Sequence, residues 1–98
     1  MSAAIEIDVH NPSGLHARPA AVFVKAAAAI PGDVRVANVT TGSSEVSAKS
    51  ILAVLALGVS SGHRIRLRLE GDGAPDALRS LAELVASGLG EPPVGAEA

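Results

Sequence analysis

The sequence contains no cysteine, no tryptophan, no tyrosine and a single phenylalanine, Phe23. Without cysteine there can be no disulfide, thiolate nucleophile or cysteine-ligated zinc, which fits a reducing compartment such as the cytoplasm. With one aromatic side chain, neither an aromatic-lined ligand pocket nor stacking on nucleic-acid bases is favoured. Hydrophobic residues nevertheless make up 48% of the chain, so aliphatic side chains must fill the core.

The sequence also lacks a strong excess of either charge and a long apolar run. Eight Lys and Arg against ten Asp and Glu give a net charge of −2, which argues against nucleic-acid binding. The longest apolar run, residues 51–57, is far shorter than the roughly 18 residues that cross a bilayer. The N-terminus lacks the basic start of a signal peptide. We expect a soluble, cytoplasmic monomer of one domain that binds proteins and does not insert into membranes.

Hydrophobic periodicity and turn residues divide the chain into seven elements. The predicted order is strand 5–9, helix 17–30, strand 33–36, strand 45–47, helix 51–57, strand 64–70 and helix 75–87. Because the strands alternate between apolar and polar residues, the sheet should be antiparallel with helices on one face only. The expected fold class is α+β, an open-faced β-sandwich with a four-stranded antiparallel sheet and three helices on one face (βαββαβα). Residues 1–90 should form the domain, and residues 91–98 a flexible tail.

His16 stands between a glycine-containing loop and the first predicted helix. The first N–H groups of a helix have no partner inside it, so a phosphoryl group on the ring would meet donors from Ala17 and Arg18. The Arg18 guanidinium matches phosphate oxygens, and the helix dipole favours a neutral imidazole that can attack phosphorus. Pro19 biases Arg18 towards an extended backbone, a distortion that would help to present the ring. A histidine before a helix is more often a capping or surface residue, so these residues alone suggest phosphate chemistry without deciding it.

Two segments carry a resemblance to a known family. Gly14-Leu15-His16-Ala17-Arg18-Pro19-Ala20 resembles the active-site motif of HPr, the histidine-containing phosphocarriers of the bacterial phosphoenolpyruvate-dependent sugar phosphotransferase system. Residues 48–58 resemble the regulatory serine segment of that family, and the resemblance extends from about Ile5 to Gly90.

The resemblance implies a role for three residues. His16 would be phosphorylated on the ring nitrogen nearer the backbone, Arg18 would neutralise charge during transfer, and Ser50 would be the regulatory phosphorylation site found in some members. The implied partners are enzyme I as donor, sugar-specific components as acceptors, and a kinase or phosphatase acting on Ser50. The protein would be an intermediate in phosphotransfer rather than a stand-alone enzyme, and we expect neither cofactor nor metal.

The predicted helix over residues 51–57 has apolar side chains around most of its circumference. Leu52 and Leu55 therefore either form an exposed patch that docks partners beside His16 or are buried in the core, and the resemblance favours docking. Ser50 can cap this helix whatever its regulatory role. His10 and His63 have no companions at metal-ligand spacing and are expected to be loop or strand-edge residues.

The predicted strand over residues 64–70 has arginines at alternate positions, 64, 66 and 68. Their alternation places them on the open face of the sheet, where Glu6 and Asp8 can pair with them. An anion site is the less favoured interpretation of these arginines.

Other functions remain compatible with this sequence. One is a regulatory interaction protein of the same fold, controlled through Ser50 and never charged on histidine. Another is a small-molecule-binding regulatory domain, because fold alone does not decide function. A third is a phosphocarrier for a nitrogen-related or dihydroxyacetone branch of the system.

Overall fold

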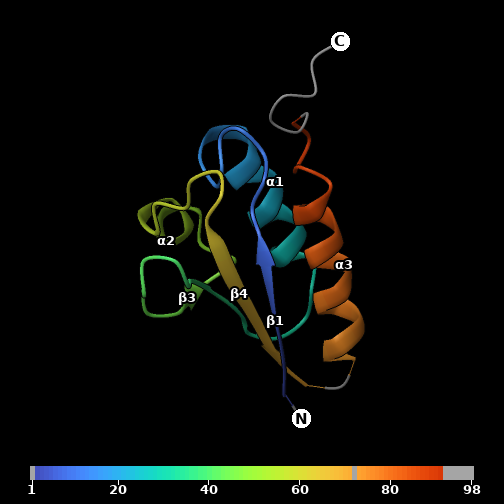
Figure 1. The fold of residues 1–98 in the computed structure, drawn as a ribbon. Helices are drawn as coiled ribbons and strands as arrows, with labels where there is room; N and C mark the ends of the chain where they lie inside the picture. The colour runs from blue at the N-terminus through green and yellow to red at the C-terminus, as the bar shows by residue number, and fades with distance from the viewer. Residues whose placement is uncertain (1, 72, 92–98) are drawn as a thin grey trace.

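The computed structural model describes residues 2–71 and 73–91. Its elements are β1 (Ser2–Asp8), α1 (Ala17–Ala28), β2 (Val34–Asn38), β3 (Val46–Ser47), α2 (Ile51–Ala56), β4 (Arg64–Glu70) and α3 (Ala74–Ala86). The four strands form one antiparallel sheet in the order β1-β4-β2-β3. Helices cover one face of this sheet and leave the other open (Figure 1). The predicted α+β open-faced sandwich is therefore confirmed.

The helix boundaries follow from local chemistry. Helix α1 ends two residues before the predicted Ile30, whose N–H bonds to the Ala27 carbonyl, three residues back, at 3.0 Å. The ammonium group of Lys49 donates to the Ile30 carbonyl at 2.6 Å, so a cation lies just past the C-terminal end of α1, where the helix dipole favours it. Helix α3 carries Pro75 in its first turn, as predicted.

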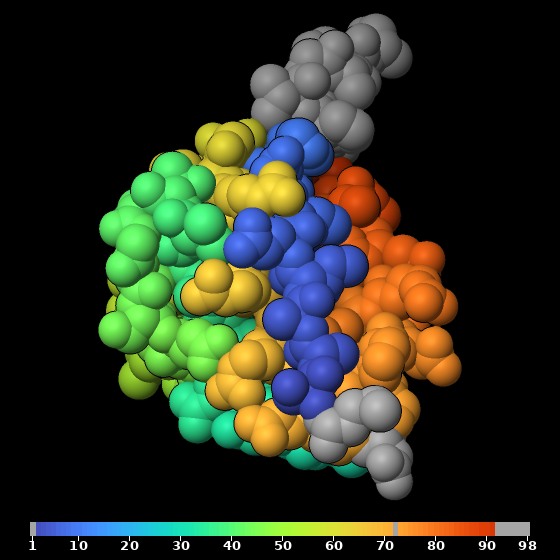
Figure 2. Space-filling view, turned by 60° about the horizontal axis from the view of Figure 1, so that its bottom comes forward, coloured from blue at the N-terminus to red at the C-terminus, as the bar shows by residue number. Residues whose placement is uncertain are grey.

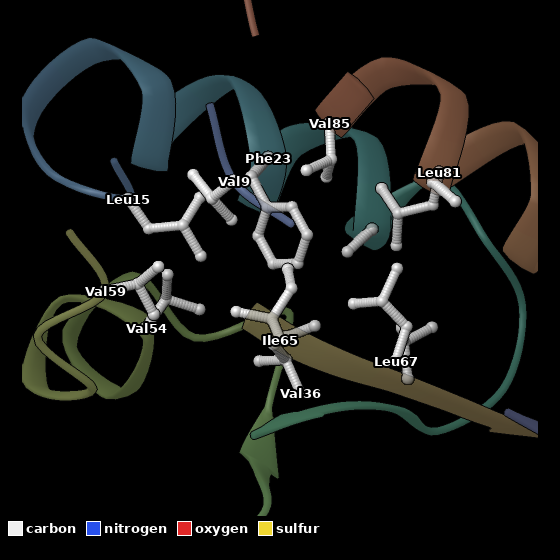
Figure 3. Packing of buried hydrophobic residues seen from close by; sticks show 14 of the residues in the cluster. Val9, Leu15, Phe23, Val36, Val54, Val59, Ile65, Leu67, Leu81 and Val85 are labelled. Carbon is white, nitrogen blue, oxygen red and sulfur yellow. The ribbon is translucent and has the colours of Figure 1, made fainter. Parts of the chain in front are cut away.

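The core lies between the sheet and the helices and is almost entirely aliphatic. Figure 3 shows the Phe23 ring at its centre, between Val9, Ile65 and Val85. These four side chains are completely buried and come from α1, from the residue after β1, from β4 and from α3. One aromatic ring contributes the large central volume that the small and branched side chains around it cannot supply.

The open face of the sheet carries cross-strand ion pairs, as the alternation predicted. Arg64 contacts Glu6 at 3.1 Å and Asp8 at 2.8 Å. Arg66 lies 3.6 Å from Glu6. Figure 2 shows β1 as a narrow strip at the surface between β4 and α3, which agrees with its place at the edge of the sheet.

Arg68 has partners that the sequence did not suggest. It contacts Glu45 at 2.9 Å and Glu70 at 2.8 Å. Glu45 precedes β3, so this pair spans β2 and ties the far edge of the sheet to β4. Hydrogen bonds from Arg68 hold the pKa of the Glu45 carboxyl below its ordinary value. The arginines are thus occupied by carboxylates, which supports the solvated-face interpretation over an anion site.

The chain after α3 is built into the domain as far as Glu91. The Glu91 N–H donates to the Gly88 carbonyl at 2.9 Å, and the side chain of Leu89 is completely buried in the core. The sequence predicts that Glu91 belongs to the flexible tail, but in the structure this residue makes the specific contacts described below. The rest of the expected tail, residues 92–98, lies outside the described residues.

Candidate active site

His16 is the N-cap residue of α1. Its backbone is extended, with φ −124° and ψ 160°, and its carbonyl accepts the first helical hydrogen bond, from Ala20 at 3.5 Å. The imidazole is exposed and makes no capping bond. It has no hydrogen-bond partner within residues 2–71 and 73–91, so its ring nitrogens are open to solvent and to an incoming reactant.

The backbone beside the ring offers two hydrogen-bond donors. Ala17 and Arg18 supply the first N–H groups of α1, and neither is paired in the part of the chain that the structure describes. Pro19, the third residue of the helix, has no N–H and is buried. An anion on the ring would therefore meet two amides at the positive end of the helix. The guanidinium of Arg18 is exposed on the same turn.

The unusual backbone conformation lies at Ala17. The sequence placed the distortion at Arg18 because of Pro19, whereas the structure gives Ala17 a φ of 53° and includes Arg18 in the helix. An alanine in the left-handed region costs about 1–2 kcal/mol. Such strain persists when surrounding contacts over-determine it, and it clusters at functional sites.

The loop before His16 is anchored against the turn that precedes β4. The Leu15 N–H donates to the Val59 carbonyl at 3.0 Å, and the Leu15 side chain is completely buried. Gly14 has a φ of +58°, and a Cβ atom there would overlap the same carbonyl oxygen. A glycine is therefore required both by the conformation and by the close backbone approach.

The same loop is held from the other end of the chain by Glu91. One carboxylate oxygen of Glu91 accepts from the Asn11 side-chain amide and from the Ser13 N–H, each at 3.0 Å. The other accepts from the Ser13 hydroxyl at 2.8 Å. The side-chain hydrogen bond from Asn11, then the bonds from Ser13, lower the pKa of Glu91, and the positive charge of Arg18 adds to the effect. Sequence reasoning missed this contact, although the glycines at 88 and 90 could have signalled a turn that redirects the chain.

Leu52 lies on helix α2, which packs against α1, and Ser50 is the N-cap residue of α2. The Ser50 hydroxyl accepts from the Ala53 N–H at 3.2 Å, so the predicted helix cap is present. Leu52 is 77% exposed and Ile51 39% exposed. Leu55 is half-buried and packs against the core. Of the two leucines proposed for docking, Leu52 is therefore the one displayed to solvent.

The other two histidines have different surroundings from His16. His63 accepts at Nδ1 from the Ser60 N–H at 3.1 Å and lies 3.1 Å from the side-chain nitrogen of buried Asn38. His10 is exposed just after β1. Across residues 2–71 and 73–91, no three histidine or acidic side chains are grouped as a metal site would require. No helix in the described residues is long and apolar enough to cross a membrane.

Fold and site together define a small α+β protein that exposes a histidine at the entrance of its first helix. Residues 3–87 match the family model described as the phosphorylation site of the HPr component of the phosphotransferase system. The phosphocarrier protein HPr of Streptomyces coelicolor is 47% identical over 87 residues, covering 89% of this chain and 91% of that protein. The crystal structure of HPr-C-His from Thermoanaerobacter tengcongensis superposes with a TM-score of 0.84 at 38% identity, covering 92% of this chain and 98% of that one. The chain belongs to the HPr family of the phosphotransferase system.

Some relatives are much longer than this chain. The multiphosphoryl transfer protein of Haemophilus influenzae is 43% identical over 83 residues, which are 85% of this chain and 17% of that protein. The chain therefore spans about a sixth of the length of that relative.

Proposed function

We propose that this protein accepts a phosphoryl group on His16 from phosphorylated enzyme I and passes it to sugar-specific acceptor proteins of the phosphotransferase system. The observation that carries the proposal is the exposed imidazole of His16 beside two helix-start amides that have no partner among the described residues. Membership of the HPr family supports the same role. A regulatory protein never charged on histidine would have no use for this arrangement. We also propose that the protein acts in the cytoplasm as a monomer.

The chemistry needs a nucleophile and compensation for negative charge. The lone pair of the His16 ring nitrogen nearer the backbone attacks phosphorus, and the bond between phosphorus and enzyme I breaks with its electron pair leaving on the donor. The phosphoryl oxygens then face the N–H groups of Ala17 and Arg18 at the positive end of α1. The Arg18 guanidinium offers a planar pair of donors and a permanent charge. Attack by a nucleophile of the acceptor reverses these changes and regenerates the neutral imidazole.

Partners approach across the surface formed by α1 and α2 in this proposal. Leu52 and its neighbour Ile51 are the exposed large apolar side chains of α2 and would supply the apolar part of this contact. Leu55 is too buried to contribute a comparable area and stabilises α2 from below. Ser50, at the start of α2, is the proposed regulatory site, where a kinase would add a phosphate next to Leu52.

A reconstituted relay tests the function. Purified protein is incubated with enzyme I and phosphoenolpyruvate labelled at phosphorus, separated, and mixed with a sugar-specific acceptor. We expect label to enter the wild type and then move to the acceptor. His16→Ala should take no label, and His10→Ala, which removes another exposed histidine, should behave as the wild type. Label that enters His16→Ala would overturn the proposal.

A further inference from the structure

The loop that carries His16 is secured by a carboxylate from the far end of the chain. Glu91 accepts three hydrogen bonds, from the Asn11 side chain, the Ser13 N–H and the Ser13 hydroxyl, at 3.0, 3.0 and 2.8 Å. Bonds to an ionised acceptor are about twice as strong as neutral ones. Asn11 is completely buried, and its amide also donates to the Gly14 carbonyl at 2.9 Å. Glu91 therefore holds two residues of the loop, one of which braces a third.

The contact reaches His16 through a single residue. Ser13 binds Glu91 with its N–H and its hydroxyl, while its carbonyl accepts from the His16 N–H at 3.2 Å. Any shift of Ser13 is thus transmitted to the backbone of the histidine. On the other side of the loop, the Leu15 N–H donates to the Val59 carbonyl at 3.0 Å, and the backbone of Gly14 lies close to the same carbonyl.

The backbone that delivers Glu91 is itself strained. Among the described residues, two that are not glycine have positive φ: Ala17, at 53°, and Leu89, at 54°. Leu89 is completely buried, and it stands between Gly88 and Gly90, whose φ values are 97° and 88°. Three successive left-handed residues turn the chain back from α3 so that Glu91 meets the loop. A strained, buried leucine is maintained only where the surroundings over-determine it.

We propose that Glu91 is a positioning residue for phosphoryl transfer: through Ser13 it holds the backbone of His16 so that the imidazole is presented in the geometry needed for attack. This role rests on the proposed carrier function of His16. Glu91 does not touch the reacting atoms, and its own charge is offset by three loop donors. It acts by limiting the freedom of a loop whose tip must meet phosphorus at close range, where small misplacements cost large factors in rate.

The test compares Glu91→Gln with Glu83→Gln. Both remove one negative charge, but Glu83 is exposed on α3 and its side chain has no partner in the described part of the chain. Below the melting temperature, we expect kcat for phosphorylation by enzyme I to fall about tenfold in Glu91→Gln. KM should stay within about twofold, because the docking residues on α2 are untouched. Amide hydrogen exchange at Ser13 and His16 should accelerate in the same variant, and Glu83→Gln should match the wild type in every measurement.

A double variant separates positioning from general stability. Ser13→Ala removes the hydroxyl bond to Glu91 and leaves the bond from the Ser13 N–H. If Glu91 acts through Ser13, adding Glu91→Gln to Ser13→Ala should therefore reduce kcat by less than adding it to the wild type. A lower melting temperature with kcat, KM and amide exchange all equal to those of Glu83→Gln would overturn the positioning role. If the wild type takes no label from enzyme I, the carrier proposal fails separately. In that case His16 is phosphorylated with potassium phosphoramidate, which needs no protein partner. Slower phosphorylation in Glu91→Gln than in the wild type would support the positioning role. Equal rates would refute that role.

Discussion

At the scale of single residues, the start of α1 holds a strained backbone next to the exposed imidazole of His16. Ala17 follows the extended His16 and precedes the rest of the helix with a φ of 53°. The left-handed conformation changes the direction of the chain between the extended His16 and the helix. A glycine would adopt this conformation without a steric penalty, yet the sequence has alanine here.

Replacing Ala17 with glycine should stabilise the domain. Relief of about 1–2 kcal/mol of strain exceeds the roughly 0.5–1 kcal/mol by which glycine favours the unfolded chain. The expected gain in unfolding free energy is therefore about 0.5–1 kcal/mol, measured as a shift in the denaturant midpoint. The matched control is Ala21→Gly, at an exposed position in the regular part of α1. It should lose about 1 kcal/mol, and equal losses in both variants would contradict the account of strain.

Residue chemistry at the site was partly predictable from sequence. The order His16, Ala17, Arg18 before a helical segment indicated a side chain next to unpaired amides, because helix ends have orphan donors in every fold. The strain at Ala17 and the contact of Glu91 with Asn11 and Ser13 were not predictable. Both depend on how the loop packs against segments distant in sequence, and local propensity contains no information about those contacts.

At the scale of elements, α2 is short and depends on its cap. It spans six residues, Ile51–Ala56, and Ser50 supplies its N-cap hydrogen bond. An isolated helix of this length is not stable in water, so the cap and the burial of Val54 maintain it. The same helix displays Leu52 to solvent, so the proposed docking residue lies on a helix that depends on Ser50 for its cap.

Changes at Ser50 should separate these two roles. Ser50→Asp keeps an oxygen that can accept from Ala53 and places a negative charge at the positive end of the helix, so the melting temperature should be nearly unchanged. Its charge must be desolvated beside Leu52 when enzyme I docks, so the initial rate of His16 phosphorylation should fall about tenfold, the effect of about 1.4 kcal/mol. Ser50→Ala should show the opposite behaviour, with a loss of about 1 kcal/mol in stability and a normal transfer rate. Equal rates in wild type and Ser50→Asp would show that α2 does not couple this serine to transfer.

Element types were the most predictable level of the structure. Period-2 alternation identified β1 and β4 because this pattern reflects one buried face. Breakers located the ends of α1 and α3 to within two residues. The strand order β1-β4-β2-β3 did not follow from them, since it is set by long-range pairing. The exposure of α2 was also undecided, because an apolar helix looks the same in sequence whether partners or the core cover it.

At the scale of the whole molecule, the two faces of the sheet have different functions. One face and the helices enclose the aliphatic core around Phe23 (Figure 3). The other carries arginines on β4 that reach carboxylates on β1 and before β3. These contacts connect β1, the first strand of the chain, to β4, the last, and connect β4 to Glu45, the residue before β3. These cross-strand ion pairs, called the ion-pair ladder below, therefore favour one strand register and one arrangement of the sheet.

The ion-pair ladder should make stability depend on pH in the acid range. In the folded state, Arg68 holds the pKa of the Glu45 carboxyl below its ordinary value of 4.5. The folded protein therefore binds a proton at Glu45 less readily than the unfolded chain does. The contribution of this ion pair to the free energy of unfolding is present at pH values above the ordinary pKa, and it is lost as pH falls through the lower pKa of the folded state. Wild type should therefore exceed Glu45→Gln in unfolding free energy at pH 7, and the gap should close progressively below about pH 4.5. A gap that stayed constant down to acid pH would show that the pair does not act through ionisation.

The most direct test of the account is the chemical nature and stoichiometry of the phosphorylated residue. After incubation with enzyme I and phosphoenolpyruvate, intact mass and phosphorus NMR are measured before and after exposure to acid and to alkali. A phosphoryl group on an imidazole nitrogen is a phosphoramidate, so we expect one phosphate per chain that is lost in acid and retained in alkali. The group should map to the peptide containing His16 and be missing from His16→Ala. An acid-stable phosphate on Ser50 alone, or no phosphate on the wild type while a known HPr is labelled by the same enzyme I, would contradict the carrier function.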